Sequence, residues 1–546
     1  MMLIKKYITI VSVSLTALFC GSCASFDDMN RNPYAVYDAT ADSFVQTILY
    51  KSQYTILQAN YNLIPQFVQQ AISTGYDSYV LMPYNYELAE ADASRLWGLY
   101  VQKGNAEAML VAAREKSDPA LEAVALILRS WVMHIITDTY GDVPYHKSGL
   151  MALQDKNYEF NIPYDSQKDI YIDLFRSLEK ANLLFQDEGC ENFNALCDFT
   201  YGGTVSKWRK FGNSLYLRLL MRASLKVNEE SDGKIDLGDE YGELDVAGKI
   251  KEIYDGFGVD DPEYPIITSV DDRMKVKFSS SDSYLYTPFY TTTSGIFNSI
   301  GACSTMVDKM IIRNEKNKVE KVDPRYFCYF TRDLGLPAQM TVADVKEYLE
   351  REITSTGRSK VGRYVSGGEY GDLKNREWYP VLNYSEILFI FAEACCRGWI
   401  TGDVKSLYLD ACEASMIEWN PMDLAKKDYE TSRESYLAWL DSEFKTDDAL
   451  NQIMTQKWIS TFWLGVESWA DYRRTGYPIL VTNGPAAAND GVLCTRITYP
   501  STEEYNNYKY YKESVDKWLG GKDNMKTDVW WADTQESKNI RILGRK

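Results

Sequence analysis

Histidine is almost absent from this chain, which has only His134 and His146 among 546 residues. Because protein zinc sites and general-base mechanisms rely largely on histidine, most chemistry of these two kinds is excluded. The sequence also lacks the GxSxG, Walker A and HExxH patterns of esterases, nucleotidases and zinc proteases. We therefore expect no cofactor and no metal site.

Positive charge is also in deficit. Aspartate and glutamate number 77 against 59 lysines and arginines, which gives a net charge of −18. A chain of this charge is repelled by nucleic acids and by anionic lipid surfaces. We expect no nucleic-acid partner, and phosphate-rich ligands are disfavoured for the same reason.

Cysteine spacing excludes a third group of structures. Eight cysteines follow position 23, at Cys190, Cys197, Cys303, Cys328, Cys395, Cys396, Cys412 and Cys494. This irregular spacing fits neither a zinc knuckle nor a dense disulfide scaffold. We interpret most of them as small core side chains, and only Cys190 and Cys197 are close enough in sequence to be tested for a bridge.

The N-terminus carries an apolar stretch. We expect no later run to be long and apolar enough to cross a membrane. Two lysines precede an apolar run over residues 8–19, which is shorter than the roughly 20 residues a membrane span needs. Gly21 and Ser22 then precede Cys23, as in bacterial lipoprotein signals, whereas bulky side chains precede Cys20. We predict a signal peptide over residues 1–22 and a lipid on Cys23, which would anchor the body without a spanning helix. The alternative is a CxxC redox or metal pair of Cys20 and Cys23.

Aromatic residues are unusually abundant. They make up 14% of the chain, with 41 tyrosines and 13 tryptophans. Tyrosine and tryptophan combine an apolar ring with a polar group, so many should lie half-exposed on binding surfaces. Sugars suit such surfaces, because each pyranose has an apolar face for stacking and a rim of hydroxyl groups.

Helical periodicity dominates the chain. Residues 169–187 place apolar side chains at steps of three and four, after a capping box of Ser166 and Asp169. The same pattern predicts helices over residues 121–137, 207–224, 384–397 and 449–463. No regular repeat is visible by eye, although small residues at contact points favour closely packed helical hairpins.

Loop-rich segments interrupt this helical body. Glycine, aspartate, serine, threonine and tyrosine become frequent over residues 229–323, again over 357–378, and in the tail 483–546. We predict one body over residues 23–546, with a helical scaffold mainly at 40–228 and 380–480. Long irregular segments on a rigid scaffold are typical places for binding sites.

Several segments occur together in an order that resembles one family. They are FDDMN and NP at 26–33, TDTYGDVPY at 137–145, WRKFGNSL at 208–215, DPR at 323–325, YSEILFIFAEA at 384–394, QKW at 456–458, WADYRRTGYP at 469–478, and finally Arg496, Tyr499, Pro500, Glu503, Asn507, Trp530 and Trp531. With these segments the chain resembles the SusD/RagB family of outer-membrane nutrient-binding lipoproteins of Gram-negative bacteria.

The resemblance implies a fold and a function. The expected fold is mostly α-helical, with about four tetratricopeptide-like helix pairs and variable loops that carry the ligand site. The expected function is capture of oligosaccharides, or in some members peptides, without chemistry. Such a protein is expected at the outer membrane, lipid-anchored and surface-exposed, as the partner of a SusC-like TonB-dependent transporter.

The motifs themselves favour a structural role. In TDTYGDVPY, Gly141 suits a helix C-terminus and Pro144 prevents the helix from continuing. Polar residues also recur on otherwise apolar helices, where we predict buried hydrogen-bond and ion-pair networks rather than an active site. These residues are Asn213, Arg218, Glu386, Glu393, Asp471, Arg473 and Arg474.

Three loop clusters of aromatic residues are candidates for the ligand site. They combine rings with short polar side chains, as adaptable recognition sites do. The first holds Tyr76, Asp77, Tyr79, Tyr84, Asn85 and Tyr86, the second Tyr284, Tyr286 and Tyr290, and the third, over residues 364–378, ends at Trp378. For any single tyrosine, packing against a neighbouring loop is the commoner role. We predict that the first two clusters converge on one shallow groove.

Three other functions stay open at this point. A glycoside hydrolase needs two carboxylates about 5 to 10 Å apart, which inspection of so acidic a sequence does not exclude. A peptide or a host glycoprotein would stack on the same rings. A purely structural subunit of the transporter would bind no small ligand alone.

Overall fold

The structure of the chain is a computed structural model. Its fold is mostly helical, as the sequence predicts. It describes residues 39–73, 86, 88–150, 161–279, 281–289, 300–330, 335–338, 343, 344, 347, 378–419, 426–482 and 489–544. Residues Ala41–Lys546 form one compact unit, to which the following description applies. The predicted signal peptide and Cys23 lie outside the described residues.

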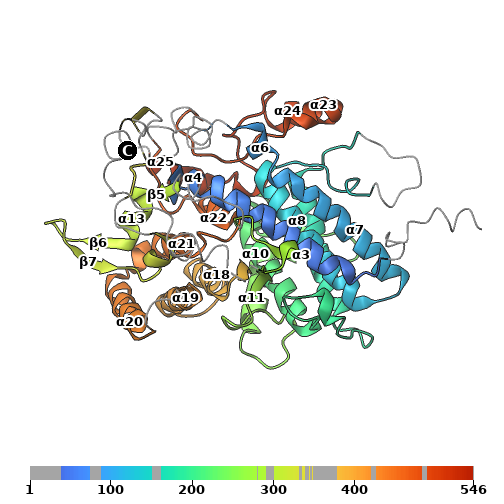
Figure 1. Cartoon of the computed structure of the whole chain (residues 1–546), viewed down its shortest axis with the longest axis horizontal. Coiled ribbons are helices and arrows are strands. Elements are labelled where there is room, and N and C mark those ends of the chain that lie inside the picture. The colour runs from blue at the N-terminus through green and yellow to red at the C-terminus, as the bar shows by residue number, and fades with distance from the viewer. Residues whose placement is uncertain are drawn as a thin grey trace, which may run out of the picture. The chain divides into compact units, whose positions relative to one another are not determined.

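The first half of this unit is built from long helices packed side by side (Figure 1). α7 packs on α8, α8 on α9, and α9 on α10. The elements here are α3 (Ser43–Asn62), α4 (Ile64–Phe67), α6 (Glu90–Ala93), η2 (Leu96–Leu99), α7 (Tyr100–Glu115), α8 (Pro119–Tyr140), α9 (Gln167–Leu184), η4 (Ala195–Cys197) and α10 (Val205–Ser231).

Local capping sets where these helices begin and end. Asp118 accepts a hydrogen bond from the backbone N–H of Leu121 at 2.9 Å at the start of α8. The helix ends at Gly141, whose φ of 87° suits glycine. The predicted cap of α9 is confirmed at Ser166, whose Oγ accepts from the backbone N–H of Asp169 at 3.2 Å, while the Asp169 carboxylate accepts from the Ser166 hydroxyl at 2.6 Å instead of completing the box at the Ser166 backbone.

The second helical half packs on α10 through α18. Its elements are α18 (Tyr384–Cys396), α19 (Val404–Glu418), α20 (Lys426–Glu443), η6 (Thr446–Asp448), α21 (Ala449–Ser460) and α22 (Glu467–Thr475). The pairs α7/α8, α9/α10, α18/α19 and α21/α22 pack as consecutive hairpins. This arrangement confirms the expected scaffold of tetratricopeptide-like helix pairs.

The segment between the two halves contains short elements. They are β2 (Lys234–Asp236), β3 (Glu243–Asp245), α11 (Val246–Asp255), β4 (Met274–Lys277), η5 (Ser283–Leu285), β5 (Ile300–Ala302), α13 (Ser304–Met310), β6 (Ile311–Arg313), β7 (Val319–Val322) and α14 (Tyr326–Tyr329). Two further strands are β1 (Ala71–Ser73) and β8 (Trp378–Leu382). The described strands form antiparallel two-stranded ribbons, β1–β5, β2–β3, β4–β8 and β6–β7.

The tail holds helices that the sequence patterns do not predict. They are α23 (Ser501–Asn506), α24 (Tyr508–Trp518), η8 (Trp530–Ala532) and α25 (Gln535–Leu543). α25 and η8 pack on α22, and η8 also packs on α10. The tail therefore returns to the middle of the scaffold.

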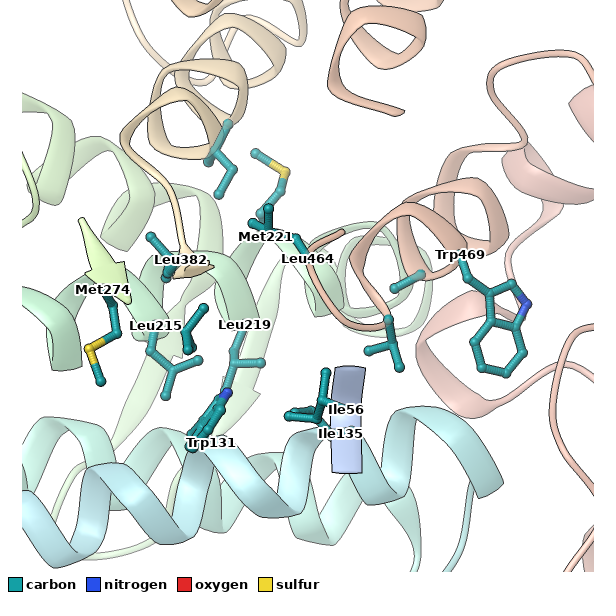
Figure 2. Packing of buried hydrophobic residues seen from close by; sticks show 14 of the residues in the cluster. Ile56, Trp131, Ile135, Leu215, Leu219, Met221, Met274, Leu382, Leu464 and Trp469 are labelled. Atoms are coloured by element: carbon teal, nitrogen blue, oxygen red, sulfur yellow. The ribbon is translucent and has the colours of Figure 1, made fainter. Parts of the chain in front are cut away.

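The hydrophobic core lies where α8 and α10 meet the strands β4 and β8. Figure 2 shows Trp131 of α8 beside Leu215 and Leu219 of α10, with Met274 and Leu382 next to them. All five side chains are buried. By length and composition α8 could cross a membrane, so the expectation that no run beyond the N-terminus is long and apolar enough is wrong. However, 89% of the apolar window of α8 is buried in the fold, as in a core helix.

The predicted polar networks are confirmed. Arg218 binds Glu386 through two nitrogens, each 2.6 Å from a carboxylate oxygen. Arg474 binds Glu393 in the same way, at 2.6 Å for both bonds, and also binds Asp471 at 2.9 Å. Bidentate pairs of this kind satisfy both buried charges, and they fix which helices lie side by side.

Arg473 and Asn213 join the same kind of network. The guanidinium of Arg473 donates to the carbonyl oxygens of Asp138 at 2.6 Å and Thr495 at 3.0 Å. Asn213 donates to Asn182 at 3.0 Å. Cys190 and Cys197 do not form a bridge, and both thiols are free.

Replacing Glu393 with Gln is expected to lower the free energy of unfolding by about 3 kcal/mol at pH 7. Burial alone would raise the pKa of Glu393, but the neighbouring Arg474 and Arg397 hold it below the ordinary 4.5. A depressed pKa stabilises the fold above pH 4.5, and this contribution is lost as pH falls further. The difference between Glu393→Gln and the parent protein should therefore shrink below that pH.

Urea unfolding between pH 3 and pH 7 measures this difference. Glu413→Gln is the matched control, because Glu413 is 46% exposed in its pair with Arg433 and should change stability by less than about 1 kcal/mol. A gap that stays constant down to pH 3 would contradict the assigned ion pair.

Candidate functional site

The β4–β8 ribbon separates a buried face from a polar face. Met274 and Val276 of β4 are buried, whereas Lys275 and Lys277 are half-buried on the opposite side. This follows from the alternation of apolar and charged residues along the strand. In the register of the ribbon, Lys277 lies directly opposite Trp378.

Trp378 is flanked by two ammonium groups. The Nζ atoms of Lys275 and Lys277 lie 5.1 Å and 5.7 Å from the centre of its ring. Both distances are within the range of cation–π attraction. Burial lowers the pKa of Lys275, and the nearby charge of Arg273 lowers it further. The ribbon thus presents an indole ring and positive charge on a protein that is acidic as a whole.

The chain that follows β4 forms a closed turn. The backbone N–H of Ser279 donates to the carbonyl of Leu285 at 2.8 Å, and Asp282 accepts from the N–H of Tyr284 at 2.9 Å. The side chain of Tyr284 is 85% exposed on this turn. A large, fully presented ring on a hydrogen-bonded turn is a feature of recognition surfaces.

Helix α3 holds this turn and the ribbon in place. Tyr50 Oη donates to the carbonyl of Tyr286 at 2.8 Å, and Gln53 donates to the carbonyl of Pro380 at 3.1 Å. Burial raises the pKa of Tyr50 to about 12, helped by Tyr54 and Asp282, so the hydroxyl keeps its proton. Phe278 lies between, with ring centres 5.3 Å from both Tyr50 and Tyr379.

The structure brings together part of the predicted site. Tyr284, Tyr286 and Trp378 come from two of the three predicted clusters, and they lie at the same end of the β4–β8 ribbon. Tyr86 has a φ of 60° and packs against the hydrophobic core, which favours the packing role for it. Six other predicted residues lie outside the described residues, namely Tyr76, Asp77, Tyr79, Tyr84, Asn85 and Tyr290.

Two segments outside the described residues, 74–85 and 290–299, adjoin residues that are neighbours in the fold. Ser73 ends β1, Ile300 begins β5, and these two residues are paired in the β1–β5 ribbon. The segment that follows residue 73 and the segment that precedes residue 300 therefore join the described fold at adjacent points. Where the first two clusters lie relative to each other stays a prediction.

Sequence reasoning missed Lys275 and Lys277. The alternation Met-Lys-Val-Lys indicates a strand with one charged face, but it does not say which residue faces that strand. The partner strand begins at residue 378, so the contact joins segments about a hundred residues apart. Only the fold reveals that two lysines flank Trp378.

An acidic cavity lies in another part of the fold. A cavity of about 420 Å³ opens between α9, the β2–β3 ribbon and α11. Its carboxylates come from Glu179, Glu240, Glu243, Asp245 and Glu252. It offers one aromatic ring, from Tyr241, and so has less stacking surface than the ribbon. Within the described parts of the chain, no group of three or more His, Cys, Asp or Glu side chains is arranged to hold a metal ion.

Solved structures share this architecture. A SusD homologue from Parabacteroides distasonis matches with a TM-score of 0.71 and 22% identity, over 91% of this chain and 98% of its own. A SusD homologue from Bacteroides fragilis matches with a TM-score of 0.69 and 21% identity, over 91% and 100%. A chitin-binding SusD homologue from Flavobacterium johnsoniae matches with a TM-score of 0.66 and 22% identity, over 91% and 98%. At this level of identity the likeness establishes the fold.

No curated protein matches the chain. The family described as "Starch-binding associating with outer membrane" matches residues 33–500, which is most of the chain. This match confirms the resemblance seen in the sequence motifs. The chain belongs to this SusD-like family of proteins associated with the outer membrane.

Proposed function

We propose that this protein is a non-catalytic glycan-binding lipoprotein that captures oligosaccharides at the cell surface. It delivers them to a SusC-like TonB-dependent transporter for nutrient uptake. The observation that carries the proposal is the aromatic surface at the end of the β4–β8 ribbon, where Trp378 and Tyr284 stand on a braced segment. The chitin-binding homologue from Flavobacterium johnsoniae supports a carbohydrate ligand by analogy.

The chemistry of the surface suits a sugar. Pyranose rings stack on indole and phenol faces, and hydroxyl groups accept hydrogen bonds from ammonium groups. Trp378 supplies a ring, and Lys275 and Lys277 supply donors next to it. Asp282, Ser281 and Ser279 lie in the turn beside Tyr284 and add short polar side chains.

One buried carboxyl whose pKa is raised, Glu418, is held in a structural role that does not suit catalysis. A glycosidase acid needs a raised pKa and access to the sugar. Burial raises the pKa of Glu418 to about 7, although hydrogen bonds from Ser385 oppose the shift. Glu418 is only 3% exposed, and its oxygens accept from the backbone and hydroxyl of Ser385 at the start of α18. This carboxyl serves the helix terminus and has no access to a glycan.

Binding without hydrolysis is the first expected outcome. Residues 24–546 are expressed and tested by affinity gels and calorimetry against plant storage, fungal and host mucosal glycans. Trp378→Ala and Tyr284→Ala should each weaken binding of the recognised glycan about tenfold, because each removes one stacking ring. Tyr79→Ala combined with Tyr284→Ala should weaken it further if the first two predicted clusters share one groove.

Tyr505→Ala is the control for these variants, because Tyr505 is 80% exposed on α23 and lies outside the proposed site. Release of sugar from the glycan would replace the proposal with a hydrolase. Absence of binding across the panel by a folded protein would favour a peptide ligand, or a site completed by the transporter. Unchanged affinity in Trp378→Ala and Tyr284→Ala would place the site elsewhere.

Lipid attachment at Cys23 makes a separate prediction. In a Gram-negative host that processes lipoproteins, Cys23→Ser should move the protein from the membrane fraction to the soluble fraction. Cys20→Ser is the matched control and should leave it in the membrane, because small residues precede only Cys23. Incorporation of labelled palmitate measures the attachment directly. Equal labelling of the parent protein and Cys23→Ser would refute the assignment.

A further inference from the structure

A second, smaller cavity lies far along the chain from the ribbon site. It has a volume of about 150 Å³ and opens between α13, α19, α20 and α21, and we name it the α20–α21 pocket. A cavity of this size holds one six-membered ring. Its lining includes Lys309, Tyr408, Tyr436, Trp439, Asn451 and Thr455. None of these residues belongs to the predicted clusters or to the β4–β8 ribbon.

Aromatic rings form one wall of the pocket. Tyr436 and Trp439 are one turn apart on α20, with ring centres 5.3 Å apart and planes inclined by 33°. Tyr436 and Tyr408 are buried, whereas Trp439 is half-buried. Tyr436 therefore supports the indole of Trp439 from within, and the partly exposed indole is the surface on which another ring can stack.

Lys309 distinguishes this pocket from a packing defect. It is half-buried near the end of α13, and within the described residues its ammonium group has no hydrogen bond and no ion pair. Other buried lysines are paired, as Lys457 is with Asp471 at 2.8 Å and Lys103 with Glu107 at 3.0 Å. Burial lowers the pKa of Lys309, although the negative charges of Asp308 and Asp448 partly oppose this shift. A desolvated ammonium group of this kind is stabilised by an anion that enters the pocket.

The polar side chains of α21 suit a hydroxylated ring. Thr455 donates to the side-chain amide oxygen Oδ1 of Asn451 at 3.4 Å, which leaves the lone pairs of the hydroxyl able to accept from a ligand. Asn451 in turn donates to Asp448 at 3.2 Å. The acidic neighbours Asp308, Asp448 and Glu443 oppose a doubly charged anion more than a singly charged one. A carboxylate is therefore favoured over a phosphate.

We infer that the α20–α21 pocket binds a single sugar ring that carries a carboxylate, a uronic acid. The ring lies against the half-buried indole of Trp439, and the carboxylate pairs with Lys309. This site is separate from the proposed glycan site, because the two share no residue. It gives the protein a way to recognise an acidic sugar unit independently of the chain bound at the ribbon.

Saturation-transfer NMR and calorimetry with D-glucuronate and D-glucose test the inference on residues 24–546. Glucuronate should bind roughly tenfold more tightly than glucose, because only glucuronate pairs with Lys309. Lys309→Met should remove this difference and leave the glucose affinity unchanged. Trp439→Ala should weaken binding of both sugars and lower the saturation transferred from the protein to their ring protons.

Lys405→Met is the matched control, since it removes one lysine from α19 at a site 40% exposed and outside the pocket. Its glucuronate affinity should stay within about twofold of the parent value. The double variant Trp378→Ala with Tyr284→Ala separates the two sites and should keep glucuronate binding. Circular dichroism checks folding, and Lys309→Gln replaces Lys309→Met if that variant does not fold.

Three results would overturn the inference. The first is equal affinity for the two sugars, or no binding of either. The second is unchanged glucuronate affinity in a folded Lys309 variant. The third is loss of glucuronate binding in the double variant Trp378→Ala with Tyr284→Ala. The last result would assign the acidic sugar to the ribbon site. Failure of the proposed glycan capture alone would leave the glucuronate result standing, because the two assays use different variants and different ligands.

Discussion

A buried ion network at the centre of α10 determines how the rest of the chain is arranged. Arg218 binds Glu386 of α18, and Arg222 binds Asp138 of α8 at 2.5 Å. Both arginines also contact Glu467, the first residue of α22. Burying so many charges costs free energy that good pairing offsets, so any other helix arrangement would leave charges unpaired. The network thus selects one packing of the helix pairs rather than adding much stability.

The tail is locked to this network as well. Trp531 donates to Asp138 Oδ1 at 2.7 Å, whereas Arg222 binds Oδ2, and Tyr171 of α9 also donates to Oδ1 at 2.6 Å. The ring of Trp531 lies 5.3 Å from the guanidinium of Arg222. Elements from the first half and the end of the chain therefore meet at one carboxylate, and Arg222 links it to Glu467 of the second half.

Local patterns predict the helices and the residue types of this network, but they do not predict its pairs. Apolar periodicity and caps predict α8, α9, α18 and α21 to within three residues at each end, whereas the prediction for α10 stops seven residues short of its end. The partner of Arg218 is 168 residues away, a separation for which periodicity carries no information. The tail helices were missed because the residues that carry the helical repeat of α24 are mostly aromatic, at Tyr508, Tyr511, Val515 and Trp518, within a segment that we interpreted by composition as loop-rich. At the candidate site, the abundance of aromatic residues in the loops predicts an aromatic surface. The position of Lys275 and Lys277 beside Trp378 is set by the register of β4 and β8, which the sequence does not reveal.

The position of the ribbon explains why a binding surface at this place would be rigid. β8 begins at Trp378 and ends at Leu382, and α18 begins two residues later, with Glu386 in its first turn. The strand that carries the indole ring therefore continues directly into the helix that the central arginine holds. From α3, Gln53 binds the backbone of this strand at Pro380, and Tyr50 binds the backbone of the turn after β4 at Tyr286. A ring that is already held in place loses little conformational entropy when a ligand stacks on it, so more of the stacking free energy is available for affinity. The same network that fixes the fold thus prepares the surface for a weakly interacting, flat ligand such as a sugar.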